Sequence, residues 1–219
     1  MTRQQPSRPL PFGYAASNPG RVRLNLIRYC YCHPASSLFL LVGPVFCAAM
    51  MLVHPHWVAG VIAFGIATLA YVSRLFIHFR SGDANPGVVI SIDPLLVAAY
   101  TDLSKIGRPY PAVKVIRCTA FQLNLDEPKV GTKVPTVCMY AGKPSADRWT
   151  DFDPKPVSTA TTNAEVIERV SMSFPKHQWQ ALVDAVRQLP KPYKRGMYTA
   201  TGERLRNWGG GGKKKDRGR

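Results

Sequence analysis

Two apolar runs decide the architecture of this chain: LFLLVGPVFCAAMMLV at residues 38–53 and WVAGVIAFGIATLAYV at residues 57–72. Only the tripeptide HPH separates them, and no Lys, Arg, Asp or Glu occurs from residue 29 to residue 73. Neither run shows the polar face that recurs at helical spacing in an amphipathic helix. The pattern therefore predicts a hairpin of two membrane-spanning helices.

The lengths of these runs agree with the thickness of a bilayer. Helices over residues 35–53 and 57–76 would be about 28 Å and about 30 Å long at 1.5 Å per residue, and a hydrocarbon core is roughly 30 Å thick. The alternative is a buried helical pair in a soluble protein, for example at an oligomer interface. Two adjacent uncharged segments of membrane length favour the hairpin.

Small residues predict that the two helices pack closely. Gly43 and Cys47 offer a small face on the first helix, and Ala59, Ala63 and Ala67 repeat every four residues on the second. Small residues let two backbones approach each other in lipid, where no hydrophobic force drives helices together.

Charge predicts the orientation of the hairpin. Arginines flank both outer ends, whereas the loop at residues 54–56 has only two histidines. Because Lys and Arg collect on the cytoplasmic side, we expect a two-span protein of the cell membrane with both termini in the cytoplasm. The residues expected at the membrane interface are Tyr29, Tyr31, Trp57, Tyr71, Arg74 and Phe76.

The net charge of +16, from 29 Lys and Arg against 13 Asp and Glu, is uneven along the chain. Residues 1–36 contain five Arg and no acid, and residues 196–219 contain seven basic and two acidic side chains. A nucleic-acid-binding domain would gather this charge on one folded face, so the expected partner is the lipid bilayer rather than nucleic acid. A separate possibility is that the basic tail contacts anionic lipid headgroups or nucleic acid.

The pattern of residue types changes after the hairpin. Turn residues at 81–87 mark a boundary, and short apolar runs then alternate with turn residues, which is typical of a small antiparallel barrel or sandwich. The predicted class is α+β: a two-helix transmembrane hairpin, then a β-rich domain with one C-terminal packing helix. The expected parts are a basic, largely disordered segment (1–34), the hairpin (35–80), the β-rich domain (81–195) and a disordered basic tail (196–219).

Two elements near the end of that domain have clear patterns. Val170, Met172 and Phe174 alternate with polar residues, which predicts a half-buried strand over residues 166–174. Pro175 and Pro190 then bound a predicted helix that should pack on the sheet. Its apolar face consists of Trp179, Leu182, Val183, Val186 and Leu189.

Candidate chemistry is sparse. The sequence lacks H-E-x-x-H, G-x-S-x-G and paired C-x-x-C motifs. Cys30, Cys32 and His33 lie together beside the first apolar run, but they leave a tetrahedral zinc site one ligand short. We therefore expect neither a metal nor a cofactor, and the role of these three residues stays open.

The loop DRWTDFDPKP at residues 147–156 is the candidate binding site. Its carboxylates stand beside two aromatic rings, which is compatible with a divalent-cation site or an aromatic peptide-binding edge. The favoured interpretation is a loop pinned by its aromatic residues, because the spacing of a calcium loop is absent. The candidate residues are Asp147, Trp149, Asp151, Phe152 and Asp153.

Short motifs in the second domain carry a family resemblance. GDANPG at residues 82–87, TDL at residues 101–103 and YPAVKV at residues 110–115, together with Trp149 and Phe152, resemble an uncharacterised bacterial membrane-associated family with a domain of unknown function. The resemblance covers residues 80–190. It implies a bacterial source and a β-rich soluble domain, and it supplies no catalytic residues.

Two functions from different classes remain. The first is a non-enzymatic membrane protein that presents its β-rich domain to a protein partner or serves as a scaffold. The alternative is a membrane-bound hydrolase or metal-dependent enzyme that uses Asp147, Asp151 and Asp153, with His177 as a further candidate. The alternative requires these side chains to converge in a pocket.

Overall fold

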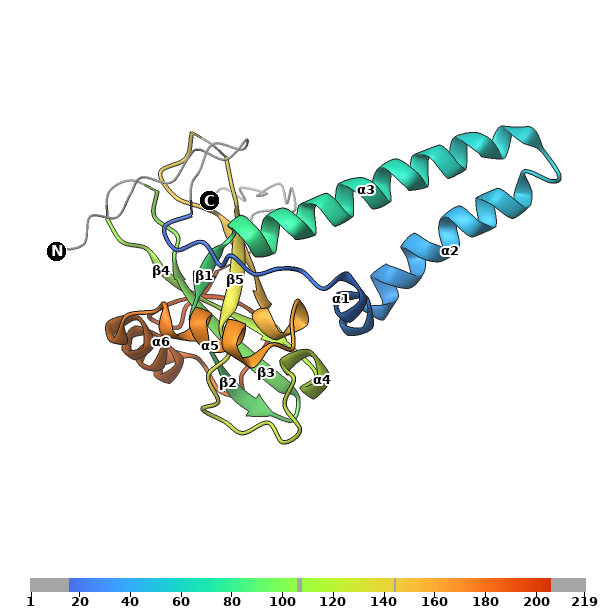
Figure 1. Cartoon of the computed structure of the whole chain (residues 1–219). Coiled ribbons are helices and arrows are strands. Elements are labelled where there is room, and N and C mark those ends of the chain that lie inside the picture. Colours follow the sequence, from blue (N-terminus) through green and yellow to red (C-terminus); the bar gives the residue numbers. More distant parts are fainter. Residues whose placement is uncertain (1–15, 106–107, 144, 206–219) are drawn as a thin grey trace, which may run out of the picture.

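The computed structural model describes residues 16–105, 108–143 and 145–205 (Figure 1). The helical elements are α1 (Leu26–Cys32), α2 (Pro34–Met50), the 3₁₀ helix η1 (Pro55–Trp57), α3 (Val58–Ser81), α4 (Ala120–Leu123), the 3₁₀ helix η2 (Val157–Thr159), α5 (Ala164–Met172) and α6 (Lys176–Gln188). The strands are β1 (Asp83–Asn85), β2 (Gly87–Ile92), β3 (Leu95–Asp102), β4 (Pro111–Arg117), β5 (Thr136–Ala141), β6 (Asp151–Pro156), β7 (Gly196–Thr199) and β8 (Arg204–Leu205).

Helices α2 and α3 form a hairpin that projects from one side of the domain, as Figure 1 shows. Gly43 makes their close approach possible, because a Cβ at this position would lie 2.3 Å from the Phe64 ring. Cys47 is buried, and its Sγ atom would lie 2.9 Å from a Cβ placed on Gly60. The small face predicted for the first helix is confirmed. The packing role predicted for the alanine repeat of the second helix is wrong, because Ala59, Ala63 and Ala67 are exposed. Gly60 is the small residue of α3 that lies against Cys47.

One helix of the described chain is long and apolar enough by itself to cross a membrane. It runs over Pro55–Ser81, with a mean hydropathy of 1.8 and only 6 % of its most apolar window buried. The other arm meets these criteria only when Leu26–Cys32 and Pro34–Met50 are taken together, and these two helices are bent by 111°. A pair of spans therefore stays a prediction.

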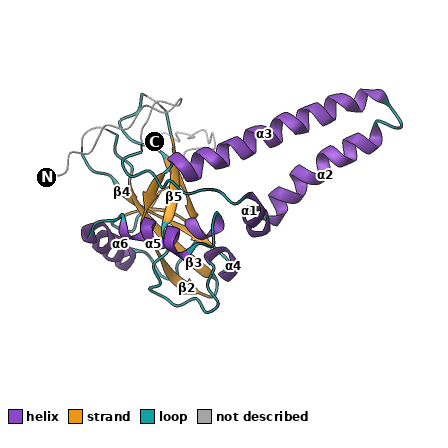
Figure 2. Cartoon of the chain, viewed as in Figure 1, coloured by secondary structure: helices purple, strands orange, loops and turns teal. Residues whose placement is uncertain are grey.

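The remainder is a domain with two antiparallel sheets. One sheet has the order β1-β5-β6 and the other has the order β2-β3-β4-β7-β8. Figure 2 shows the strands at the centre of the domain with helices outside them. The predicted α+β class and the antiparallel strands are confirmed.

The predicted C-terminal packing helix is α6. Leu182 and Ala185 are buried in one apolar cluster with Ala98 of β3 and Val113 of β4. The helix follows Pro175 and ends at Gln188, directly before the buried Leu189. Its apolar face covers the five-stranded sheet, as its periodicity predicts. One predicted member of that face is wrong, because Val183 is 39 % exposed and Ala185 is buried instead.

The strand predicted over residues 166–174 is wrong, because α5 occupies most of this segment. Asn163 caps the helix, since its side chain accepts hydrogen bonds from the N–H groups of Glu165 and Val166. Val170 is buried while Met172 is 72 % exposed, so these residues do not share one face. In so short a segment the cap decides between helix and strand.

The N-terminal segment also differs from the disorder expected over residues 1–34. Residues 17–25, here called the strap, run along the end of α3, where Gly20 N–H bonds Gly82 O at 2.9 Å and Val22 N–H bonds Phe79 O at 3.0 Å. Val22 and Leu24 are buried in the domain core. The alternation Arg21-Val22-Arg23-Leu24 is itself the pattern of a half-buried extended segment. The disorder expected over residues 196–219 is wrong for the first part of that segment, because β7 pairs with β4 and β8 pairs with β7 in the five-stranded sheet. Residues 1–15 and 206–219 lie outside the described residues.

Candidate functional site

The predicted binding loop runs into β6, which pairs with β5. Asp151 and Asp153 lie opposite Ala141 and Met139, and Phe152 between them is buried with 1 % of its surface exposed. Such alternation is the ordinary two-sided pattern of a strand.

Lysines neutralise the two carboxylates of β6. Lys114 Nζ lies 2.8 Å from Asp151 Oδ1, and Lys155 Nζ lies 3.2 Å from Asp153 Oδ2. Burial would by itself raise the pKa of Asp153, but Lys155 and His78 outweigh it and hold that pKa below its usual value. Asp153 therefore serves as an ionised partner of Lys155 near neutral pH.

The third carboxylate stands apart from these two. Asp147 is exposed before β6, and its backbone carbonyl accepts a hydrogen bond from Lys105 N–H at 3.0 Å. His177 is exposed on α6. Within the described parts of the chain, no group of three or more His, Cys, Asp or Glu side chains could hold a metal ion. The convergence that the enzyme alternative requires does not occur among these residues.

Aromatic and basic side chains stack around the start of β6. Trp149 stacks on Tyr140 with ring centroids 5.6 Å apart, and Lys105 Nζ lies 4.1 Å from the centre of the Trp149 ring. Arg148 lies 4.4 Å from the centre of the Tyr110 ring. Backbone bonds hold the same loop, since Trp149 N–H donates to Leu103 O at 2.8 Å. The geometry agrees with a pinned loop. Tyr110, Arg148 and Trp149, here called the rim, form an amphipathic surface on one end of the domain.

The free edge of β6 is closed to a further strand. Pro154 and Pro156 lie opposite Cys138 and Thr136, and because proline has no N–H, the missing donors lie on the side away from β5. On that side Phe152 N–H bonds Asp151 Oδ1, and Lys114 Nζ donates to Phe152 O. A peptide therefore cannot add to the β6 edge of this sheet through backbone hydrogen bonds.

A part-buried polar network that the sequence pattern did not predict lies behind this rim. Tyr140 Oη donates to Asp83 Oδ2 at 2.9 Å and lies 2.6 Å from Thr101 Oγ1. Asn18 N–H of the strap bonds Asp83 Oδ1 at 2.8 Å. Burial raises the pKa of Asp83, and the hydrogen bonds from Asn18 and Tyr140 oppose that rise. The available signal was that Asp83 is the first acidic residue of the chain, inside the GDANPG motif.

Four of the five cysteines are buried, and Cys30 is half-buried. All five are free, and Cys32, Cys47, Cys118 and Cys138 are buried. Burial raises the pKa of Cys138 to about 12, so its thiol stays protonated and unreactive.

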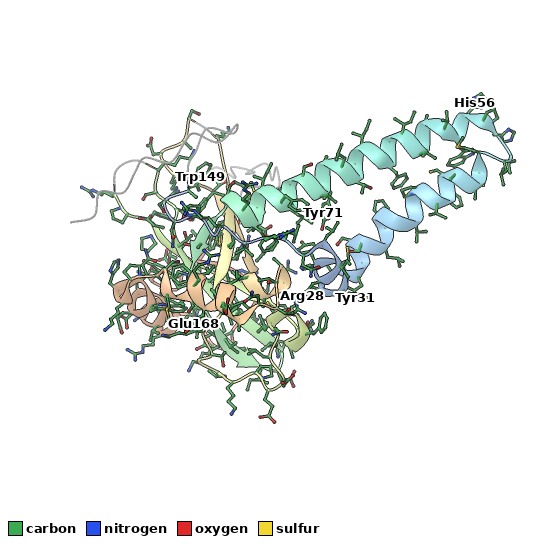
Figure 3. All side chains as sticks on the ribbon, in the orientation of Figure 1. Arg28, Tyr31, His56, Tyr71, Trp149 and Glu168 are labelled. Atoms are coloured by element: carbon green, nitrogen blue, oxygen red, sulfur yellow. The ribbon has the colours of Figure 1, made fainter. Side chains whose placement is uncertain are left out.

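Of the residues expected at the membrane interface, one is placed elsewhere. Tyr29 is 2 % exposed and packs edge-on against Phe79 in the domain core, so it cannot face headgroups. Tyr31, Arg74 and Phe76 are exposed, and Tyr71 and Trp57 are half-buried. Figure 3 shows Tyr31 and Tyr71 where the hairpin meets the domain.

The hairpin itself carries a continuous set of exposed apolar side chains. Leu52 is 91 % exposed, and Val45 and Leu69 are each 69 % exposed. Water-soluble domains rarely leave so many large apolar side chains open. The other exposed apolar residues of the hairpin include Leu38, Phe39, Val42, Phe46, Met51, Val53, Val58, Ile62 and Ile66.

Comparison with known proteins places the domain in a family. No curated protein matches the chain. A solved structure from Corynebacterium diphtheriae, described as a "putative membrane protein", is similar at 25 % identity with a TM-score of 0.45, and the match covers 52 % of this chain and 98 % of that one. The profile of the family described as "Protein of unknown function (DUF3239)" matches residues 72–190, close to the range of the predicted resemblance. This chain therefore belongs to the DUF3239 family.

Proposed function

We propose that this protein is an integral membrane protein whose hairpin crosses the bilayer twice and holds the α+β domain at the cytoplasmic surface. The exposed apolar surface of the hairpin is the single observation that carries this proposal. Each exposed Leu, Ile or Phe would gain about 1.5–3 kcal/mol on leaving water, and lipid is the solvent that surrounds a projecting hairpin on all sides.

The geometry sets the depth of insertion. Leu75 and Phe79 at the end of α3 are buried in the domain, and Arg74 is exposed just before them. The part of the second arm that lipid can surround therefore ends near Arg74. It spans about 25 Å from Trp57, and α2 with its 17 residues is also about 25 Å long. Local thinning of the bilayer accommodates a shortfall of a few ångströms.

The domain would serve as an interaction module for a protein partner or as a scaffold. The rim of Tyr110, Arg148 and Trp149 supports this role, because aromatic and arginine side chains are the ones that most often dominate protein interfaces. The described residues offer no observation that favours the enzyme alternative.

Alkaline extraction of membranes tests the anchor. The full-length protein should stay in the pellet after washing at high pH, as an integral protein does. Release into the supernatant would reject the proposal. A Trp149→Ala variant tests the interaction role, and unchanged recovery of every partner that the wild type retains would reject the rim as the binding surface.

A further inference from the structure

We propose that four arginines at the base of the hairpin bind the headgroups of anionic phospholipids. They are Arg21, Arg23, Arg74 and Arg80, here called the arginine face, and all four are exposed. The inference rests on the proposed membrane anchor, and it names a lipid class and a site outside the basic tail.

The fold brings the two pairs together from segments far apart in the sequence. Arg21 N–H bonds Arg80 O at 3.2 Å, so the strap lies directly against the last turns of α3. Val22 N–H bonds Phe79 O at 3.0 Å, so Arg23, the next residue of the strap, also lies near the end of this helix. The strap and α3 therefore present their arginines from one junction.

These cations have no acidic partner in the described structure. The ion pairs formed by the described residues use Lys114, Lys155 and Arg187 instead. The first 82 residues contain no Asp or Glu. Asp83 is the next residue, and its carboxylate already accepts hydrogen bonds from Asn18 N–H and Tyr140 Oη. Adjacent unpaired cations repel one another, and an anion supplied from outside would relieve that repulsion.

A neighbouring arginine shows what a structural role looks like. Arg28 Nε donates to Ser158 O at 2.7 Å, and its Nη2 donates to Phe121 O at 3.1 Å. The guanidinium also lies over the Phe121 ring. Arg28 is therefore used inside the protein and is not part of the arginine face.

Rigid attachment fixes the height of the arginine face. Helix α3 continues without a break from its exposed apolar part into the core, where Phe79 is fully buried. The domain consequently cannot swing away from the bilayer on a flexible linker. Arg74 follows the exposed Leu69 by little more than one turn, so the face begins where hydrocarbon gives way to headgroups. The planar guanidinium of arginine binds an anionic phosphate group in bidentate fashion.

Native mass spectrometry of the full-length protein in detergent tests the proposal, with phosphatidylglycerol and phosphatidylcholine as competing probes. The wild type should prefer phosphatidylglycerol, by about fivefold for each arginine that contacts a headgroup. The quadruple variant R21Q/R23Q/R74Q/R80Q should lose most of this preference. The matched control R117Q/R187Q/R195Q/R204Q removes equal charge from β4, α6, β8 and the residue before β7, and it should keep the preference.

Two further variants make every outcome decisive. Replacement of the same four arginines by lysine keeps the charge and should keep most of the preference, and separate R21Q/R23Q and R74Q/R80Q variants serve if the quadruple variant does not fold. Loss of the preference on deletion of residues 206–219, or equal loss in the control variant, would overturn the proposal. A protein that resists alkaline extraction but shows no lipid preference disproves only this inference, whereas extraction would disprove the anchor.

Discussion

The hairpin and the domain use the same apolar residues in opposite ways. Ile66 of the hairpin is 65 % exposed, whereas Val97 at the centre of the five-stranded sheet is fully buried. The domain hides its apolar side chains from water between its two sheets and beneath α6. The hairpin hides only a narrow seam and leaves the rest open. The two regions therefore suit different solvents.

Removal of a phenylalanine ring should give the largest difference in stability loss between the domain and the hairpin. Phe152→Ala should destabilise the domain by about 3–5 kcal/mol, because it empties a fully packed position. Phe39→Ala should cost far less, because Phe39 is 65 % exposed and lipid refills the space. Urea unfolding of both variants in detergent micelles measures this difference, and equal losses would contradict the comparison.

An arginine placed on the exposed surface of the hairpin or of the domain should give the next largest difference, measured as membrane insertion. Ile66→Arg should reduce membrane insertion, at a cost of about 2.5–3.5 kcal/mol for an arginine near the middle of a span. Ile92→Arg is the matched control, since Ile92 is 53 % exposed at the end of β2 and faces water. The alkali-resistant fraction of each variant reports the effect. Normal retention of Ile66→Arg would show that α3 does not lie in lipid.

Two glycines of the hairpin test how closely α2 and α3 pack against each other. Gly43→Ala should destabilise the helix pair by about 1–3 kcal/mol, because the new methyl group would collide with Phe64. Gly65→Ala should be neutral or slightly stabilising, since no atom lies within 4 Å of a Cβ at that position. Titration of each variant with a denaturing detergent measures helix separation. Equal midpoints would mean that the two arms do not pack as described.

The smallest expected effect is the pH dependence of the stability that two aspartates contribute to the domain. Burial raises the pKa of Asp83 above its ordinary value of 3.8, so its contribution to stability is complete below that pH and is lost as the pH rises through the folded pKa. The pKa of Asp153 is lowered, with Lys155 and His78 outweighing burial, so its contribution is present above pH 3.8 and is lost as the pH falls.

The two corresponding variants should therefore change the pH profile of stability in opposite directions. Asp83→Asn should flatten the loss of stability on the alkaline side of pH 3.8, and Asp153→Asn should flatten the loss on the acidic side. Thermal unfolding between pH 3 and pH 7 measures both profiles. A wild-type profile in Asp83→Asn would show that the Asp83 carboxylate is not buried as the hydrogen bonds to Asn18 and Tyr140 require.

Much of this fold follows from local pattern. The apolar runs, the boundary near residue 81 and the face of α6 could be read from the sequence, because each depends on the periodicity of one segment. The segment that became α5 could not, since its apolar residues fit both a strand and a helix until the Asn163 cap is seen. Residues 17–25 were missed for a related reason: four alternating residues are too few to predict that an end of the chain packs against α3.

The candidate site was harder to predict than the fold. Sequence placed Trp149 and Asp151 in one loop, but their partners Tyr140 and Lys114 come from other strands. The Asp83 network likewise joins the strap, β1 and β5, which are distant in the chain. Contacts of this kind depend on tertiary packing, so spacing along one segment cannot reveal them.

The tip of the hairpin and the domain should lie on opposite sides of a membrane. Figure 3 labels His56 at the tip and Glu168 on the domain. In a cysteine-free variant carrying His56→Cys or Glu168→Cys, an impermeant maleimide applied to intact cells should label the first and not the second. The Glu168→Cys variant should react only after the membrane is opened. Labelling of both positions from the same side would contradict a hairpin that crosses the bilayer.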